Sequence, residues 1–128
     1  SYDFGTFFGD IKAGNFQLYS LTWVGLKTPD TFRYIFHSGS IPPGGANRGR
    51  YRSLKADRLI ESAEHETDID AQVILYRQLQ EQLLHDLPYV PLWYEDQLAA
   101  YRPESIDDYV PRRDGSYDAL IGLQQQRE

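Results

Sequence analysis

A cluster of basic residues is the feature of this sequence whose chemistry is easiest to name. It lies in the stretch NRGRYRSLKADR, residues 47–58, and consists of Arg48, Arg50, Arg52, Lys55 and Arg58. Guanidinium groups bind carboxylates and phosphates through paired hydrogen bonds. We expect Arg48 to contact a ligand or another part of the protein, and an ordinary solvated loop is the alternative. No glycine-rich phosphate-binding motif precedes a helix here.

A tryptophan close to a glycine is the second candidate binding feature. Trp23 ends an apolar run, and Gly25 then allows the backbone to turn. Groups at such strand ends often face ligands in α/β proteins. We expect Trp23 to form an apolar wall of a binding site, with core packing as the alternative. Backbone groups would be offered to the ligand by the residues that follow, Val24, Gly25, Leu26 and Lys27.

Motifs for nucleophilic catalysis are missing. The chain has no cysteine, no Gly-x-Ser-x-Gly sequence, and no serine near a histidine with an acid to orient it. Whether two carboxylates lie at the separation that glycoside hydrolysis needs is a spatial question, which the sequence leaves open. We predict that the chain is not an enzyme and keep an unrecognised hydrolase as a third hypothesis.

The histidines and acidic residues do not have the spacing of a metal site. His37, His65 and His85 fall on different predicted elements, and the sequence HETDI, which begins at His65, lacks the second histidine of the zinc motif H-E-x-x-H. Asp68 and Asp70 lack the glycine and the final glutamate of a calcium loop. We predict no metal ligand and no cofactor, with the histidines at the surface or at helix ends.

Composition sets the class of protein. A chain of 128 residues is the size of one domain, and its net charge of −6 argues against a nucleic-acid partner. No apolar run approaches the roughly 20 residues that span a bilayer. The absence of cysteine is compatible with any compartment, including the periplasm. The chain also has no methionine, so we expect it to be processed or cut from a longer product.

The apolar pattern predicts helices and strands in alternation. Helices are predicted over 3–13, 28–37, 56–66 and 70–86, with Asp3, Thr28 and Asp68 as N-caps, Pro29 as a first helical residue and Gly14 as a stop. Strands are predicted over 16–24 and 89–101. The loop 38–53 and the tail 102–128 are expected to be irregular, because glycine, proline and polar residues dominate them.

This order predicts a mixed α/β fold in which helices pack on a sheet, within a single unit that covers residues 1–128. Residues 16–24 are apolar on both faces, which is typical of a strand covered on both sides. Two strands do not form a self-sufficient sheet. We therefore expect the sheet to be incomplete, with its missing strands supplied by the remainder of the parent chain or by another copy.

The chain resembles the C-terminal portion of the family 5 extracellular solute-binding proteins, the peptide, dipeptide and nickel receptors of ABC importers. The resemblance runs over about residues 5–101, from GNFQLYSLTWVG through PDTFRYIFHSGS to GGANRGRYRSLKADRLIESAEHETDIDAQVILYRQLQEQLLHDLPYVPLWYED. Its most specific part is an Asn, then a Tyr, then an Asp that opens a helix, followed by D..AQ..LY..LQ..L...LPYVPLW. Each motif is weak alone, and their order and spacing carry the resemblance.

The resemblance implies part of one lobe of a two-lobed periplasmic or lipid-anchored receptor. Such a receptor closes around a peptide or other solute and delivers it to a membrane permease. In peptide receptors of this family the matching loop reads Trp-x-x-Asp, and its acid pairs with the ammonium group of the peptide. Here Leu26 stands at the acidic position and Lys27 follows. Because an unpaired buried ammonium costs several kcal/mol, free-amine peptides are disfavoured.

Several ligands and one other function stay open. The presence of Leu26 in place of the acid is compatible with three kinds of ligand: N-blocked peptides, opine-like or sugar-derived compounds, and a peptide held by backbone hydrogen bonds. Asp30 is a less favoured substitute for the missing acid. The leading hypothesis is a non-catalytic solute-binding component of an ABC importer. The alternative is a stand-alone interaction or assembly module, with exposed aromatics and no solute ligand.

Overall fold

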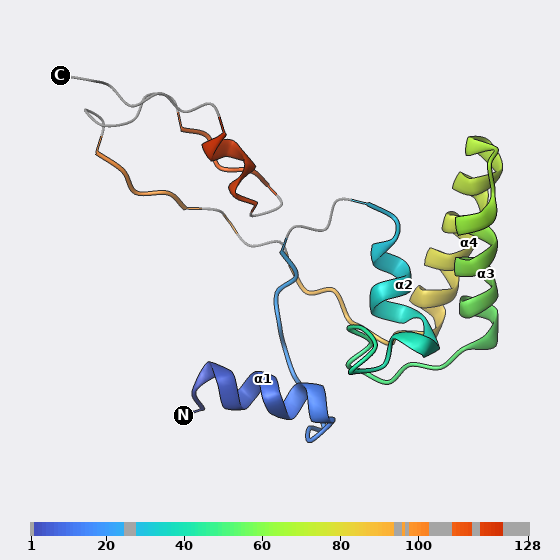
Figure 1. Cartoon of the computed structure of the whole chain (residues 1–128), viewed down its shortest axis with the longest axis horizontal. Helices are drawn as coiled ribbons and strands as arrows, with labels where there is room; N and C mark the ends of the chain where they lie inside the picture. Colours follow the sequence, from blue (N-terminus) through green and yellow to red (C-terminus); the bar gives the residue numbers. More distant parts are fainter. Residues whose placement is uncertain are drawn as a thin grey trace. The chain divides into compact units, whose positions relative to one another are not determined.

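The computed structural model of this chain contains helices and irregular segments in the residues that it describes (Figure 1). The described residues are 2–24, 28–93, 96, 98–102, 109–113 and 116–121. In chain order their helices are α1 (Phe4–Ala13), α2 (Thr31–Phe36), η1 (Ser38–Ser40), α3 (Leu54–His65), α4 (Ile69–Asp86) and η2 (Tyr117–Leu120), where η marks a 3-10 helix.

The chain divides into two compact units, which we describe separately. Residues 1–20 and 28–91 form the first, the helical unit, which contains α1 to α4. Residues 21–27 and 92–128 form the second, the tail unit, whose described part contains η2. The polypeptide therefore passes between the two units three times along its sequence.

Helix α1 begins and ends where the sequence predicts. The Asp3 carboxylate accepts a hydrogen bond from the Thr6 backbone amide at 3.0 Å, so the predicted N-cap is confirmed. Gly14 ends the helix in the left-handed conformation, at φ 86°, which disfavours a side chain. Ile11 is buried, whereas Phe4 is 69% exposed. Only the later part of the apolar stripe of α1 therefore reaches a core.

Helix α2 begins later than predicted. The sequence favours Thr28 as its N-cap and Pro29 as its first helical residue, but Asp30 is the N-cap and Thr31 the first helical residue. The backbone carbonyls of Thr28 and Pro29 accept hydrogen bonds from the amides of Thr31, at 3.2 Å, and Phe32, at 2.9 Å. A turn thus precedes the helix and replaces the predicted cap.

Helices α3 and α4 form a hairpin with a short connection (Figure 1). The Ser53 hydroxyl accepts a hydrogen bond from an amide in the first turn of α3. The Asp68 carboxylate accepts one from the Ala71 amide at 2.8 Å, which confirms the predicted cap of α4. Leu87 ends α4 in the left-handed conformation, at φ 46°, and Pro88 follows it. Local capping chemistry therefore fixes both helices of the hairpin.

The core of the helical unit lies where α2, α3 and α4 meet. Ala56 and Ile60 of α3 and Leu79 of α4 are fully buried there. Half-buried apolar and aromatic side chains pack around them, namely Phe32, Phe36, Tyr51, Leu59, Tyr76 and Leu83. Each large apolar side chain buried in this way stabilises the fold by about 1.5–3 kcal/mol. The loop after α2 and the helical hairpin thus share one core.

The prediction of a mixed α/β fold with a sheet is wrong, because no residue that the structure describes lies in a strand. The described residues of the two predicted strands, 16–24 and 89–101, are irregular instead. β-propensity measures how well side chains fit a pleated, half-buried surface, and a strand also needs a neighbour for its backbone hydrogen bonds. Leu18 is 92% exposed, and the two segments meet through the side chains of Tyr19 and Tyr89.

The tail unit has little regular structure in its described residues. Helix η2 is a single short turn, and no hydrogen bond from a side chain caps its start. The rings of Tyr101 and Tyr109 pack edge to face, with centroids 6.1 Å apart. The irregular tail predicted over 102–128 falls in this unit, and the structure describes only part of it.

Candidate functional site

A buried asparagine organises the loop between α2 and α3. Asn47 has no exposed surface, and its side-chain nitrogen donates hydrogen bonds to the carbonyls of His37, at 3.1 Å, and Tyr51, at 2.8 Å. Its side-chain carbonyl accepts from the Tyr51 amide at 2.9 Å. Asn47 thereby ties the start of the loop to its end, and the loop between them has a fixed shape.

A second anchor joins this loop to α3. The Asp57 carboxylate accepts two hydrogen bonds from Ser38, from the backbone amide at 2.9 Å and from the hydroxyl at 2.6 Å. His37 lies beside it, with its Nε2 atom 3.2 Å from Glu61 and its Nδ1 atom accepting from the Gly39 amide at 3.0 Å. The His37 side chain is 14% exposed, and the residue is the C-cap of α2, which agrees with the predicted place at a helix end.

The basic cluster of the sequence is divided among different contacts. The Arg48 guanidinium carbon lies 5.0 Å from the centroid of the Phe8 ring, a cation–π arrangement. Arg50 donates a hydrogen bond to the Ala13 carbonyl at 2.7 Å. A Cβ atom on Gly14 would lie 2.6 Å from the Arg50 Nε atom, so a larger residue there would displace this guanidinium. Both arginines therefore hold α1 against the loop.

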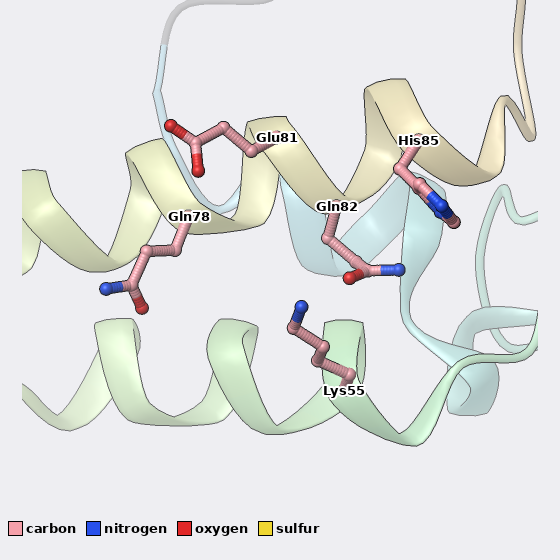
Figure 2. A pocket seen from close by; sticks show the side chains of 5 residues that line it. All are labelled: Lys55, Gln78, Glu81, Gln82 and His85. Atoms are coloured by element: carbon pink, nitrogen blue, oxygen red, sulfur yellow. The ribbon is translucent and has the colours of Figure 1, made fainter.

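Lys55 lines a groove between α3 and α4 of about 500 Å³, together with Gln78, Glu81, Gln82 and His85 (Figure 2). Lys55 extends from α3 toward α4, Gln82 extends from α4 toward Lys55, and Gln78 extends from α4 toward α3. An ammonium group and two carboxamides can donate hydrogen bonds to a carboxylate or carbonyl oxygen. The groove is open and lies on the surface of the hairpin.

A hydrogen-bond network closes the C-terminal end of α4. The Asp86 carboxylate accepts from the Tyr51 hydroxyl at 2.5 Å, from Gln82 at 2.8 Å and interacts with His85 at 2.9 Å. The bond from Tyr51, followed by those from His85 and Gln82, lowers the pKa of Asp86 to about 2. Burial, reinforced by the bond to Asp86, raises the pKa of Tyr51 to about 12.

A chain of aromatic rings continues from the core to the two irregular segments. Phe36 packs edge to face on Tyr89, with centroids 5.5 Å apart, and Tyr89 packs on Tyr19 at 6.4 Å. The hydroxyl groups of Tyr19 and Tyr89 are hydrogen bonded at 2.8 Å. Burial, followed by this hydrogen bond, raises the pKa of Tyr19. We call Tyr19 and Tyr89 the tyrosine pair.

The sequence predicts a run of five ligand-binding residues, 23–27, and the structure describes two of them. Trp23 is half-buried and Val24 is 62% exposed, both in the tail unit. Gly25, Leu26 and Lys27 lie outside the described residues. Trp23 and Val24 are neighbours in the tail unit, and Arg48 belongs to the helical unit. The predicted roles of all six residues in ligand binding remain predictions.

The part of the chain that the structure describes shows neither a metal site nor a membrane-spanning helix. There, no group of three or more histidine, cysteine, aspartate or glutamate side chains is placed to hold a metal ion. No helix among the same residues is both long and apolar enough to cross a membrane.

Known proteins offer no guide to the site. No protein-family model matches this chain, and neither a curated protein nor a solved structure is significantly similar to it.

Sequence reasoning misses most of the contacts that organise the loop. Asn47 stands among glycines and arginines, which is typical of an exposed loop, and only its place in the resemblance singles it out. The bond between Tyr51 and Asp86 and the tyrosine pair join residues 35 and 70 positions apart. No local pattern signals such long-range pairs.

Proposed function

We propose that this chain is part of the solute-binding receptor of an ABC importer. The receptor captures a peptide or peptide-like solute by closing its lobes and passes it to a membrane permease. It is a binding protein without catalytic activity, and it works in the periplasm or is lipid-anchored outside the cell. Differential binding to the closed form drives the motion, so the solute shifts a conformational equilibrium and undergoes no reaction.

One observation supports this proposal: four residues of the family resemblance, Asn47, Tyr51, Asp57 and Leu79, make contacts that hold the helical unit together. Asn47 is the buried clamp of the loop, and Tyr51 is bonded to it and to Asp86. Asp57 anchors the loop to α3, and Leu79 is fully buried in the core.

Exposed apolar side chains in the irregular segments support the part of the proposal that concerns partners. Large apolar residues with exposed fractions of 60–95% occur here, namely Val90, Leu92, Trp93, Leu98, Val110, Tyr117 and Ile121. Exposed apolar side chains in this number are available for contact with a partner. We infer that the remainder of the parent receptor covers them, or failing that another copy of this chain.

The chemistry of the loop around Trp23 supports a solute without a free ammonium group. Leu26 cannot neutralise an ammonium, and Lys27 would repel it. Trp23 supplies an indole ring for apolar contact, and the backbone of Val24 to Lys27 supplies hydrogen bonds. N-blocked peptides and opine-like compounds fit such a site better than free peptides do.

Calorimetry tests the proposal directly. The complete product of the gene is titrated with N-acetylated peptides, the same peptides with free amines, and opines. We expect binding of at least one N-blocked class, weakened at least tenfold by Trp23→Ala, because a buried indole contributes more than 1.4 kcal/mol. Binding unaffected by Trp23→Ala would refute the site, and no binding by any solute would refute the receptor.

The exposed apolar surface also favours the alternative of an assembly module without a solute ligand. Light scattering on the 128-residue chain distinguishes the two hypotheses. A defined oligomer that binds no solute supports the module, whereas a chain that becomes monodisperse only with the rest of the receptor supports the receptor.

A further inference from the structure

Helix α4 carries a second apolar stripe, which lies outside the core. Its apolar members are Ile69, Val73, Leu84 and, directly after the helix, Leu87, with exposed fractions of 75%, 51%, 64% and 54%. Two exposed polar residues, Arg77 and Gln80, lie between them. Successive members are three or four positions apart, so they share one face of the helix. We call these six residues the outer stripe.

The outer stripe is separate from the side of α4 that faces the core. On that side Leu79 is fully buried, and Tyr76 and Leu83 pack against the buried residues. Tyr76 also stacks on Phe32 of α2, with ring centroids 5.6 Å apart. Helices α2 and α3 therefore cover the core side of α4, whereas the described helices of the helical unit leave the outer stripe exposed.

The outer stripe has the same order of residues from either end. It consists of two apolar, two polar and again two apolar residues. An interface between two identical copies about a two-fold axis uses the same surface twice, so a stripe of this order matches itself when two α4 helices lie antiparallel. The facing pairs are then Ile69 with Leu87, Val73 with Leu84, and Arg77 with Gln80. Each apolar side chain meets an apolar one, and the guanidinium can donate to the carboxamide oxygen.

The charges beside the stripe suit the same antiparallel pairing. Glu81 lies four residues after Arg77, so the two side chains are neighbours on one flank of α4. Neither side chain forms an ion pair with a residue that the structure describes. In the antiparallel pair, Glu81 of the second copy lies about 2 Å along the helix axis from Arg77, because each residue rises about 1.5 Å. Two reciprocal ion pairs thus form along this flank.

We propose that the outer stripe is a dimerisation surface, on which α4 of a second copy of this chain packs antiparallel about a two-fold axis. Its apolar residues form the centre of the contact, and the charges of Arg77 and Glu81 set the direction of the helices, because a parallel pair would place like charges together. The 18 residues of α4 span about 27 Å, so the contact is small for a protein interface. The dimer is therefore weak and dissociates on dilution. This surface goes beyond the receptor function and does not depend on it.

Analytical ultracentrifugation of the 128-residue chain, from micromolar to millimolar concentration, tests the surface. We expect a reversible equilibrium between monomer and dimer. Leu84→Glu places a charge among the apolar residues and should raise the Kd of the dimer at least about tenfold. Ile74→Glu is the matched control, because Ile74 is 53% exposed on the same helix but lies about 100° around it from the middle of the stripe.

Two results would overturn the dimerisation surface. One is a chain that stays monomeric throughout this range. The other is self-association, as a dimer or as larger aggregates, that Leu84→Glu and Ile74→Glu change to the same extent. Circular dichroism of both variants shows whether each one keeps its helices, so that a loss of dimer is not mistaken for a loss of fold.

Charge exchange tests the antiparallel pairing itself. Arg77→Glu and Glu81→Arg each place four like charges along the flank of the dimer, so each variant alone should dimerise at least about tenfold more weakly. A mixture of the two variants should recover dimerisation, because every charge on this flank then faces an opposite one. A mixture that dimerises no better than either variant alone would refute the pairing.

Failure of this inference differs from failure of the receptor function, because dimerisation is measured without a solute. If the complete gene product binds N-blocked peptides in calorimetry while the 128-residue chain stays monomeric, the receptor stands and the dimerisation surface is refuted. If the complete product binds no solute while Leu84→Glu abolishes the dimer of the chain, the surface stands and the receptor is refuted.

Discussion

Asn47 and Tyr51 exchange two hydrogen bonds, in which the Asn47 side chain accepts from the Tyr51 amide at 2.9 Å and donates to the Tyr51 carbonyl at 2.8 Å. The same side-chain nitrogen also donates to the His37 carbonyl. One buried amide thus bonds to three backbone groups from both ends of the loop, and it is the partner of both Tyr51 groups, while the His37 carbonyl also accepts a hydrogen bond from the Ser40 amide at 2.9 Å.

Replacement of Asn47 by alanine should therefore destabilise the helical unit strongly. The substitution leaves the Tyr51 amide and carbonyl without this partner, and each unsatisfied buried group costs about 1–3 kcal/mol. We expect a loss of about 2–4 kcal/mol in the free energy of unfolding, measured by urea denaturation.

Asn15 provides the control for this prediction. It is exposed, and its side chain makes one weak contact with Asp10 at 3.4 Å. Asn15→Ala should change the free energy of unfolding by less than about 0.5 kcal/mol. Similar losses in the free energy of unfolding at the two positions would show that the buried Asn47 stabilises the protein no more than an exposed asparagine does.

Two glycines of α1 should respond to alanine in opposite directions. Gly14 has a φ of 86°, a left-handed conformation that strains a residue with a Cβ atom, so Gly14→Ala should cost about 1–2 kcal/mol. Gly9 is inside the helix with no atom within 4 Å of its Cβ position, so Gly9→Ala should stabilise by up to about 1 kcal/mol. Circular dichroism in urea measures both, and a loss at Gly9 would contradict the helix as described.

Two leucines of α4 should distinguish its buried face from its exposed one. Leu79 is fully buried among the core residues, so Leu79→Ala should cost about 2–5 kcal/mol, through lost burial and the cavity left behind. Leu84 is 64% exposed, and Leu84→Ala should change stability by less than about 1 kcal/mol. Thermal and urea unfolding of both variants check this, and equal losses would mean that the exposed face of α4 is packed.

The helices are predictable from sequence because their signals are local. Asp3 and Asp68 stand three residues before the amides that they cap, and Gly14 follows the last apolar residue of its stripe. The predicted start of α2 is wrong because Thr28 and Pro29 also suit a turn, and a turn at these residues precedes the helix in the structure.

The absence of strands from the described residues could not be predicted in the same way. A strand depends on a neighbouring strand, and the local sequence does not show whether one is present. Residues 16–24 have β-forming side chains, but what they meet is decided elsewhere in the chain. The same holds for the candidate site. Arg48 is predicted to contact a ligand because it is an arginine in a loop. Its packing on Phe8 depends on where α1 lies, which the local sequence does not show.

The Asp86 carboxylate should make the stability of the protein depend on pH in the acid range. Its pKa is about 2 in the folded chain against an ordinary value of 3.8, so folding favours the ionised form. The resulting stability is present above pH 3.8 and is lost as the pH falls toward 2. Asp86→Asn should therefore lower the melting temperature at pH 5, and the difference from the unaltered chain should shrink between pH 4 and pH 2. Glu81→Gln, on the same helix, is the control without this network, and a difference for Asp86→Asn that is independent of pH would contradict the bond from Tyr51 as its cause.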